Sequence, residues 1–123
     1  MRNHILRTIE AAANEEDPAK QKEMLTFVIV GGGATGVEYA GALAELIYQP
    51  LEKDYPRIKL KELAKVILIE AGSQLLSGID EGSYTAERLT KIGVDVRLNT
   101  KVASQGPLAN IYWEFRQPSS KGN

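Results

Sequence analysis

Three glycines at fixed spacing, Gly31, Gly33 and Gly36, stand where an apolar run gives way to a helical pattern. In a strand–turn–helix unit, the first would make the tight turn, the second would let the backbone approach a pyrophosphate, and the third would let the helix pack close to the strand. Backbone N–H groups at the helix start, with the helix dipole, can hold phosphates without a basic side chain. A flexible connection is the alternative interpretation, whereas a P-loop is excluded because no Gly-Lys-Ser/Thr closes the motif. The motif predicts a dinucleotide site formed by Gly31, Gly32, Gly33, Ala34, Thr35 and Gly36.

An acid, Glu70, ends a second apolar run that begins at Lys65. A carboxylate at the carboxyl end of the second strand can accept hydrogen bonds from the adenosine ribose and would repel a 2′-phosphate, which favours NADH over NADPH. Its separation from the glycines exceeds the typical spacing of about 20 residues. The charged stretch at residues 52–62, which we expect to be a surface excursion, accounts for the excess. A solvated acid at a strand end is the alternative. The pattern predicts that Glu70, with the adjacent Ala71, lines the nucleotide site.

A second acid, Glu38, lies two residues after Gly36 and has two interpretations. Negative charge in the first turn of a helix is favoured by the dipole, and Thr35 with Glu38 has the spacing of a capping box. In this motif, however, the helix begins near the second glycine, which places Thr35 inside the helix and argues against capping. The residues alone leave a structural and a functional role for Glu38 open.

The remaining residue types restrict the chemistry further. The sequence has no cysteine and one histidine, His4, which we expect to be a surface or packing residue, so we expect no thiol nucleophile, catalytic triad or metal site. A formal net charge of −1 gives no reason to expect nucleic acid as a partner. The apolar runs fall short of the roughly 20 residues that span a bilayer, and the first residues lack the features of a secretory signal.

Length and composition are those of one globular domain: 123 residues, of which 43% are hydrophobic and 25% charged. Apolar periodicity predicts two helices ahead of the glycine turn, the second starting after Asp17-Pro18, and then alternating strands and helices. This order predicts an α/β fold, a Rossmann-like three-layer unit with a parallel sheet (β-α-β-α-β), incomplete because it is half of a doubly wound sheet. The expected helices span residues 2–14, 19–24, 34 to about 51 and 81–92, and the expected strands span residues 25–30, 65–70 and 94–98.

We expect three parts along the chain: a helical connector at residues 1–24, a partial NADH-binding domain at 25–102 and an irregular tail at 103–123. Within the tail, the alternating pattern around Ile111 and Trp113 is compatible with an edge strand. The polar residues that follow are typical of a frayed terminus.

Three stretches resemble the NADH-binding domain of the type II NADH dehydrogenases. They are residues 26–43, TFVIVGGGATGVEYAGAL; residues 65–76, KVILIEAGSQLL; and residues 91–102, KIGVDVRLNTKV. The leading residues 2–6 and 18–24 are similar to the helices that join the flavin and NADH domains of that family. The resemblance covers roughly residues 2–102.

The resemblance implies a polypeptide with two dinucleotide folds, the first for FAD and the second for NADH, that passes two electrons from NADH through the flavin to quinone. By this resemblance the phosphate-binding glycines correspond to Gly31, Gly33 and Gly36, the ribose acid to Glu70, and the acid near the nicotinamide and flavin to Glu38. The implied partners are NADH, the remainder of the flavoprotein, and quinone. Peripheral attachment to the bacterial plasma membrane or the mitochondrial inner membrane is implied as well.

The sequence also departs from that family. We find no first glycine loop for FAD, no quinone site and no carboxyl-terminal amphipathic segment in it, and residues 103–123 do not resemble the family. Hydride transfer needs an acceptor held beside the nicotinamide, so we expect this chain alone to bind nucleotide without turnover. Two alternatives stay open: the NAD(P)-binding segment of another two-domain flavoprotein reductase, and a nonenzymatic nucleotide-binding or interaction module.

Overall fold

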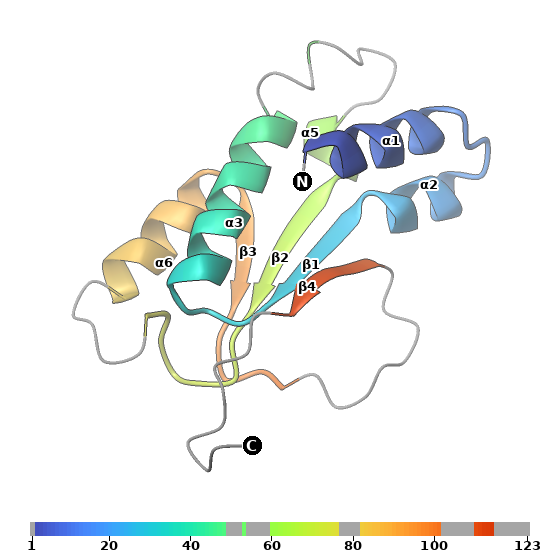
Figure 1. Cartoon of the computed structure of the whole chain (residues 1–123). Helices are drawn as coiled ribbons and strands as arrows, with labels where there is room; N and C mark the ends of the chain where they lie inside the picture. The colour runs from blue at the N-terminus through green and yellow to red at the C-terminus, as the bar shows by residue number, and fades with distance from the viewer. Residues whose placement is uncertain (1, 49–52, 54–59, 77–81, 102–109, 115–123) are drawn as a thin grey trace.

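A four-stranded parallel sheet with the order β3-β2-β1-β4 organises the chain (Figure 1). The structure is a computed structural model that describes residues 2–48, 53, 60–76, 82–101 and 110–114. The strands are β1 (Thr26–Val30), β2 (Lys65–Ile69), β3 (Val94–Arg97) and β4 (Asn110–Glu114). The helices in the described ranges are α1 (Arg2–Ala13), α2 (Pro18–Met24), α3 (Ala34–Leu46), α5 (Leu60–Leu63) and α6 (Gly82–Lys91). The predicted α/β class, with a parallel sheet and two leading helices, is confirmed.

The two central strands are apolar at nearly every position because both of their faces are buried. Phe27 and Ile29 of β1 belong to the main core, whereas Val28 belongs to a smaller cluster that includes Ile67 of β2. Side chains alternate across a strand, so these two clusters lie on opposite faces of the sheet. The continuous apolar runs in the sequence therefore predicted buried central strands correctly.

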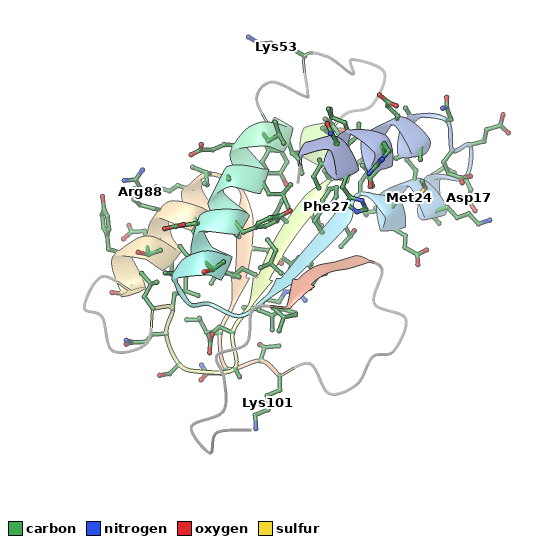
Figure 2. All side chains as sticks on the ribbon, in the orientation of Figure 1. Asp17, Met24, Phe27, Lys53, Arg88 and Lys101 are labelled. Atoms are coloured by element: carbon green, nitrogen blue, oxygen red, sulfur yellow. The ribbon has the colours of Figure 1, made fainter. Side chains whose placement is uncertain are left out.

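The main core lies between the sheet and the helices. Ile5 and Ile9 of α1 are fully buried in it, together with Leu43 of α3 and Phe27, and Leu89 of α6 is nearly so. Figure 2 shows Phe27 where β1 begins, beside α1 and α2. Helix α1 thus packs into the same core as the sheet, as its helical spacing of isoleucines predicted.

Local signals set the helix ends. Asp17 caps α2, with its Oδ1 accepting from the Ala19 N–H at 3.0 Å. Gly93, just after α6, has a φ of 105° and turns the chain into β3. Both signals were predicted. Helix α3 ends at Leu46 and is followed by a π-type turn at residues 47–48, so the last residues of the longer helix predicted to about 51 lie outside the described residues.

The sequence predicted that the charged stretch at residues 52–62 is a surface excursion, and Leu60 departs from this prediction. Leu60 begins the short helix α5 and is fully buried in the main core. The prediction was wrong for Leu60 because it rested on the charge of the neighbouring residues, whereas this leucine is apolar and packs in the core ahead of β2.

β4 adds a fourth strand to the three of the predicted β-α-β-α-β pattern, and it lies at the edge of the sheet, in the part of the tail whose pattern was compatible with an edge strand. β4 pairs in parallel with β1, with Val28 opposite Ile111 and Val30 opposite Glu114, and the register shifts between Val28 and Ile29. The alternating tail residues favoured a strand, since β-branched and aromatic residues suit a pleated surface. Its partner was not predictable from the pattern.

Candidate functional site

The glycine turn leaves β1 at its carboxyl end and leads into α3 (Figure 1). Gly31 has a φ of 113°, which side-chain-bearing residues rarely adopt, and its N–H donates to the carbonyl of Ile69 at 2.8 Å. A Cβ on Gly36 would overlap the carbonyl oxygen of Gly31. The tight turn predicted at Gly31 is confirmed. The close packing predicted at Gly36 is also present, although the group nearest to Gly36 is the carbonyl of Gly31 in the turn and not the strand.

The amino end of α3 opens from this turn. Gly33 is the N-cap residue, in an extended conformation with φ −76° and ψ −176°, and no side chain caps the helix there. The first N–H groups of a helix lack intrahelical acceptors, and the helix dipole places positive charge at this end. Ala34 and Thr35, the first two helical residues, are exposed. The arrangement can therefore receive an anion such as a phosphate.

The cap position also decides one of the open interpretations. Because Gly33 is the cap, Thr35 is already the second residue of α3. A capping box that uses Thr35 with Glu38 is therefore wrong. Glu38 lies in the second turn of the helix and is exposed, which leaves a functional role for it untested.

The half-buried Glu70 joins the two segments of the site. Its Oε1 accepts from the Gly32 N–H at 2.7 Å, and its Oε2 accepts from the Gly72 N–H at 2.6 Å. Its backbone N–H donates to the carbonyl of Arg97 at 2.9 Å, so its position also depends on β3. The acid predicted from the end of the second strand thus lies directly against the glycine turn.

The segment that follows Glu70 contacts the same turn, which the sequence analysis did not predict. The N–H of Leu76 donates to the carbonyl of Gly32 at 2.8 Å, and the fully buried Leu75 packs against the α-carbon of Gly32. The available signal was an apolar pair, Leu75-Leu76, directly after the polar Ala71-Gly72-Ser73-Gln74 turn. Such a pair marks a loop that returns to the core.

Other residues singled out in the sequence lie elsewhere. Ala71 is exposed next to Glu70, and His4 is exposed on α1. Across the ranges that the structure describes, no group of His, Cys, Asp or Glu is arranged to hold a metal ion. Nor does any helix in these ranges have the length and apolar character needed to cross a membrane.

The order of the strands places the glycine turn at a topological switch. β2 and β3 follow on one side of β1, whereas β4 lies on the other side. Open parallel α/β sheets bind ligands in the crevice outside the carboxyl ends of the strands at such a point. The fold and the glycine turn together define a Rossmann-type α/β unit.

Comparison with known proteins identifies the family. Residues 2–108 match the profile of the pyridine nucleotide-disulphide oxidoreductases, and the chain belongs to this family. Type II NADH:quinone oxidoreductase Ndh of Mycobacterium tuberculosis is 38% identical over 104 residues, which are 83% of this chain and 22% of that protein. External NADH-ubiquinone oxidoreductase 2 of Saccharomyces cerevisiae mitochondria is 41% identical over 106 residues, 83% of this chain and 19% of that protein. The resemblance to type II NADH dehydrogenases noted in the sequence is confirmed.

A solved structure agrees with these relatives. The NDH2 of Plasmodium falciparum in complex with NADH matches the fold with a TM-score of 0.75 and 25% identity, covering 82% of this chain and 21% of that one. The chain thus spans about a fifth of the length of the relatives it matches. The family match includes the glycine turn, Glu38 and Glu70, whereas β4 lies beyond its last matched residue, 108.

Proposed function

We propose that this chain forms the NADH-binding unit of a flavin-dependent NADH dehydrogenase. The observation that carries the proposal is the hydrogen bond from the Gly32 N–H to Glu70, at 2.7 Å, which holds the carboxylate that we assign to the ribose against the turn that we assign to the pyrophosphate. The names of the relatives, which are NADH:quinone oxidoreductases, support the same conclusion.

The described residues fit such a nucleotide. No side chain at Gly33 or Gly36 obstructs the start of α3, whose N–H groups would bind the pyrophosphate. Ionised carboxylates offer about four acceptor sites, and each oxygen of Glu70 has one backbone partner, Gly32 or Gly72. The remaining sites would accept hydrogen bonds from the ribose hydroxyls. A 2′-phosphate at the same place would meet negative charge, so we expect NADH to bind more tightly than NADPH.

The reaction of the larger enzyme is part of the proposal. FAD, when bound in the other dinucleotide fold that the resemblance implies, supplies the acceptor of a hydride from NADH, and quinone receives the electrons in turn. In this scheme the present chain binds and orients NADH, and the exposed carboxylate of Glu38 on α3 lies near the nicotinamide. The chain alone would bind the nucleotide without turnover. We place the enzyme peripherally at a respiratory membrane on the basis of its mitochondrial and bacterial relatives.

Calorimetric titration of the chain with NADH and with NADPH tests the proposal. Wild type should bind NADH more tightly than NADPH. Glu70→Ala should weaken NADH binding by about tenfold or more, since the two hydrogen bonds that we propose between Glu70 and the ribose hydroxyls, worth about 0.5–1.5 kcal/mol each, are lost. The affinity for NADPH should change less, because loss of the repulsive charge offsets any loosening of the turn. Glu87→Ala, on the exposed surface of α6, is the control for charge and should leave both affinities unchanged. Equal losses for both nucleotides would refute the ribose role, and absence of NADH binding by wild type would refute the proposed function.

A further inference from the structure

Gly32, the middle residue of the glycine turn, is held by all of its backbone groups. Its N–H donates to Glu70 Oε1 at 2.7 Å, and its carbonyl accepts from the Leu76 N–H at 2.8 Å. A Cβ at this position would lie 2.6 Å from Leu75 Cδ2 and 3.0 Å from Glu70 Oε1. The three residues that make these contacts, Glu70, Leu75 and Leu76, belong to one segment, residues 70–76, which lies about forty positions further along the chain.

The requirement for glycine at this position is different from that at Gly31. Gly31 and Gly93 are the glycines with positive φ among the described residues, so the backbone of Gly32 is open to any residue type. A methyl group at this position would require the side chains of Leu75 and Glu70 to shift from their present places. The motif spacing assigns fixed duties to Gly31, Gly33 and Gly36 but gives no reason for a glycine at position 32.

We propose that residues 70–76 form a brace that holds the glycine turn in its ligand-binding shape before any nucleotide arrives. Gly32 is the docking point of the brace, and Glu70 and Leu75 are its positioning residues. That the turn receives a nucleotide rests on the function proposed above.

The brace is itself attached to two neighbouring elements. Its amino end is bonded beyond β3, where the N–H of Thr100 donates to the Glu70 carbonyl at 3.0 Å and the N–H of Asn99 donates to the Gly72 carbonyl at 2.9 Å. At its other end Leu75 is fully buried in the main core, and its carbonyl lies against the α-carbon of Gly82, the first residue of α6. The brace therefore connects the glycine turn to the segment after β3 and to the start of α6, and these contacts restrain its position.

The brace has a consequence for the ligand. Because the Gly32 N–H is already bonded to Glu70, the donors for the phosphates must come from Gly33 and the first turn of α3. The ribose hydroxyls meet a carboxylate that two backbone N–H groups have already oriented, those of Gly32 and Gly72. A site ordered in advance lowers the cost of binding.

Hydrogen exchange measured by NMR on the nucleotide-free chain tests the brace. In wild type, the amides of Gly32 and Leu76 should exchange at least a hundredfold more slowly than in an unstructured peptide. Glu70→Gln keeps the size of the side chain, but its amide oxygen can accept from only one of its two present donors, so the amide of Gly32 or of Gly72 should exchange at least tenfold faster. The amides of β2 should keep their rates, as should all of these amides in the control Glu87→Gln.

A double-mutant cycle tests the contact between Leu75 and Gly32 independently. Gly32→Ala should lower the urea midpoint of wild type clearly, and it should lower the midpoint of Leu75→Ala much less, because the new methyl group occupies the space that the leucine leaves. Where a variant does not fold, exchange in the wild-type chain still decides the question.

Two results would overturn the brace: a Gly32 amide that exchanges in wild type at the rate of an unstructured peptide, or additive effects of the two alanine substitutions. Neither measurement uses a nucleotide. A protected Gly32 amide in a chain that does not bind NADH would support the brace and refute only the proposed function.

Discussion

The α-carbon of Gly36 faces the carbonyl oxygen of Gly31 so closely that a Cβ at position 36 would overlap that oxygen. Gly31 cannot turn away easily, because its N–H is bonded to the carbonyl of Ile69 at 2.8 Å. The contact is thus between two backbone segments, so no side-chain movement can make room for a larger residue at position 36. It brings the first turn of α3 next to the glycine turn, where its N–H groups can reach an anion.

Gly36→Ala should lower the free energy of unfolding by about 2–3 kcal/mol, because α3 must move away from the turn to accommodate the methyl group, as in an overpacked core. The same movement should weaken NADH binding. Urea denaturation followed by circular dichroism measures the first effect, and calorimetry measures the second.

Gly41→Ala is the matched control on the same helix. A Cβ there would meet Leu89 Cδ2 at 3.5 Å, an ordinary contact. Since alanine is favoured over glycine in a helix by about 0.8–1 kcal/mol, this variant should be as stable as wild type or more stable. Equal destabilisation by the two substitutions would show that the contact between Gly36 and Gly31 is not the cause.

Gly93→Ala should lower the free energy of unfolding by about 1–3 kcal/mol, since the residue combines an unfavourable backbone with a steric overlap. Its φ is 105°, and a Cβ would lie 2.7 Å from Cε2 of the Tyr48 ring. Thermal unfolding measures the effect. Lys91→Ala, exposed at the end of α6, serves as the control and should unfold near the wild-type temperature. An unchanged melting temperature for Gly93→Ala would contradict the assignment.

Asp17→Ala should lower the free energy of unfolding by about 1 kcal/mol, because Oδ1 of Asp17 accepts from the Ala19 N–H at the start of α2. Asp17→Asn retains an acceptor and should cost little, and the exposed neighbour Glu16 can be changed to alanine as a further control. Chemical denaturation compares the three variants. A loss in Asp17→Asn as large as in Asp17→Ala would indicate that charge, instead of capping, is responsible.

Those parts of the site that depend on local sequence were predictable. Gly31 can make the turn because glycine readily adopts a positive φ. Glu70 stands at the carboxyl end of β2 because the apolar run ends there. Parallel strands bring their carboxyl ends to one edge of the sheet, so the proximity of the acid to the glycine turn follows from the pattern of elements.

Those parts that depend on distant contacts were not predictable. The role of Gly32 comes from Leu75 and Leu76, whose path after β2 no local rule specifies. Likewise, the burial of Leu60 depends on its contacts in the main core, and the pairing of β4 with β1 joins segments that lie far apart in the sequence. Periodicity predicts that an element exists, whereas these three features depend on what the element meets.

Stability at high pH should depend on Tyr48. Its hydroxyl donates to the carbonyl of Ala64 at 2.9 Å, and burial raises the pKa of Tyr48 above its ordinary value of 10.0. Below about pH 10 the Tyr48 side chain is neutral in the folded and in the unfolded state, and its contribution to stability is fully present. As the pH rises further, the unfolded chain loses the proton first, so the free energy of unfolding should fall until the raised pKa of the folded state is passed.

Urea midpoints across this pH range should therefore decline in wild type and in Tyr84→Phe, whose ring is 60% exposed, and should decline less in Tyr48→Phe. An equal decline in all three would mean that another group is responsible, and that the hydroxyl of Tyr48 is as accessible to solvent in the folded chain as in the unfolded one.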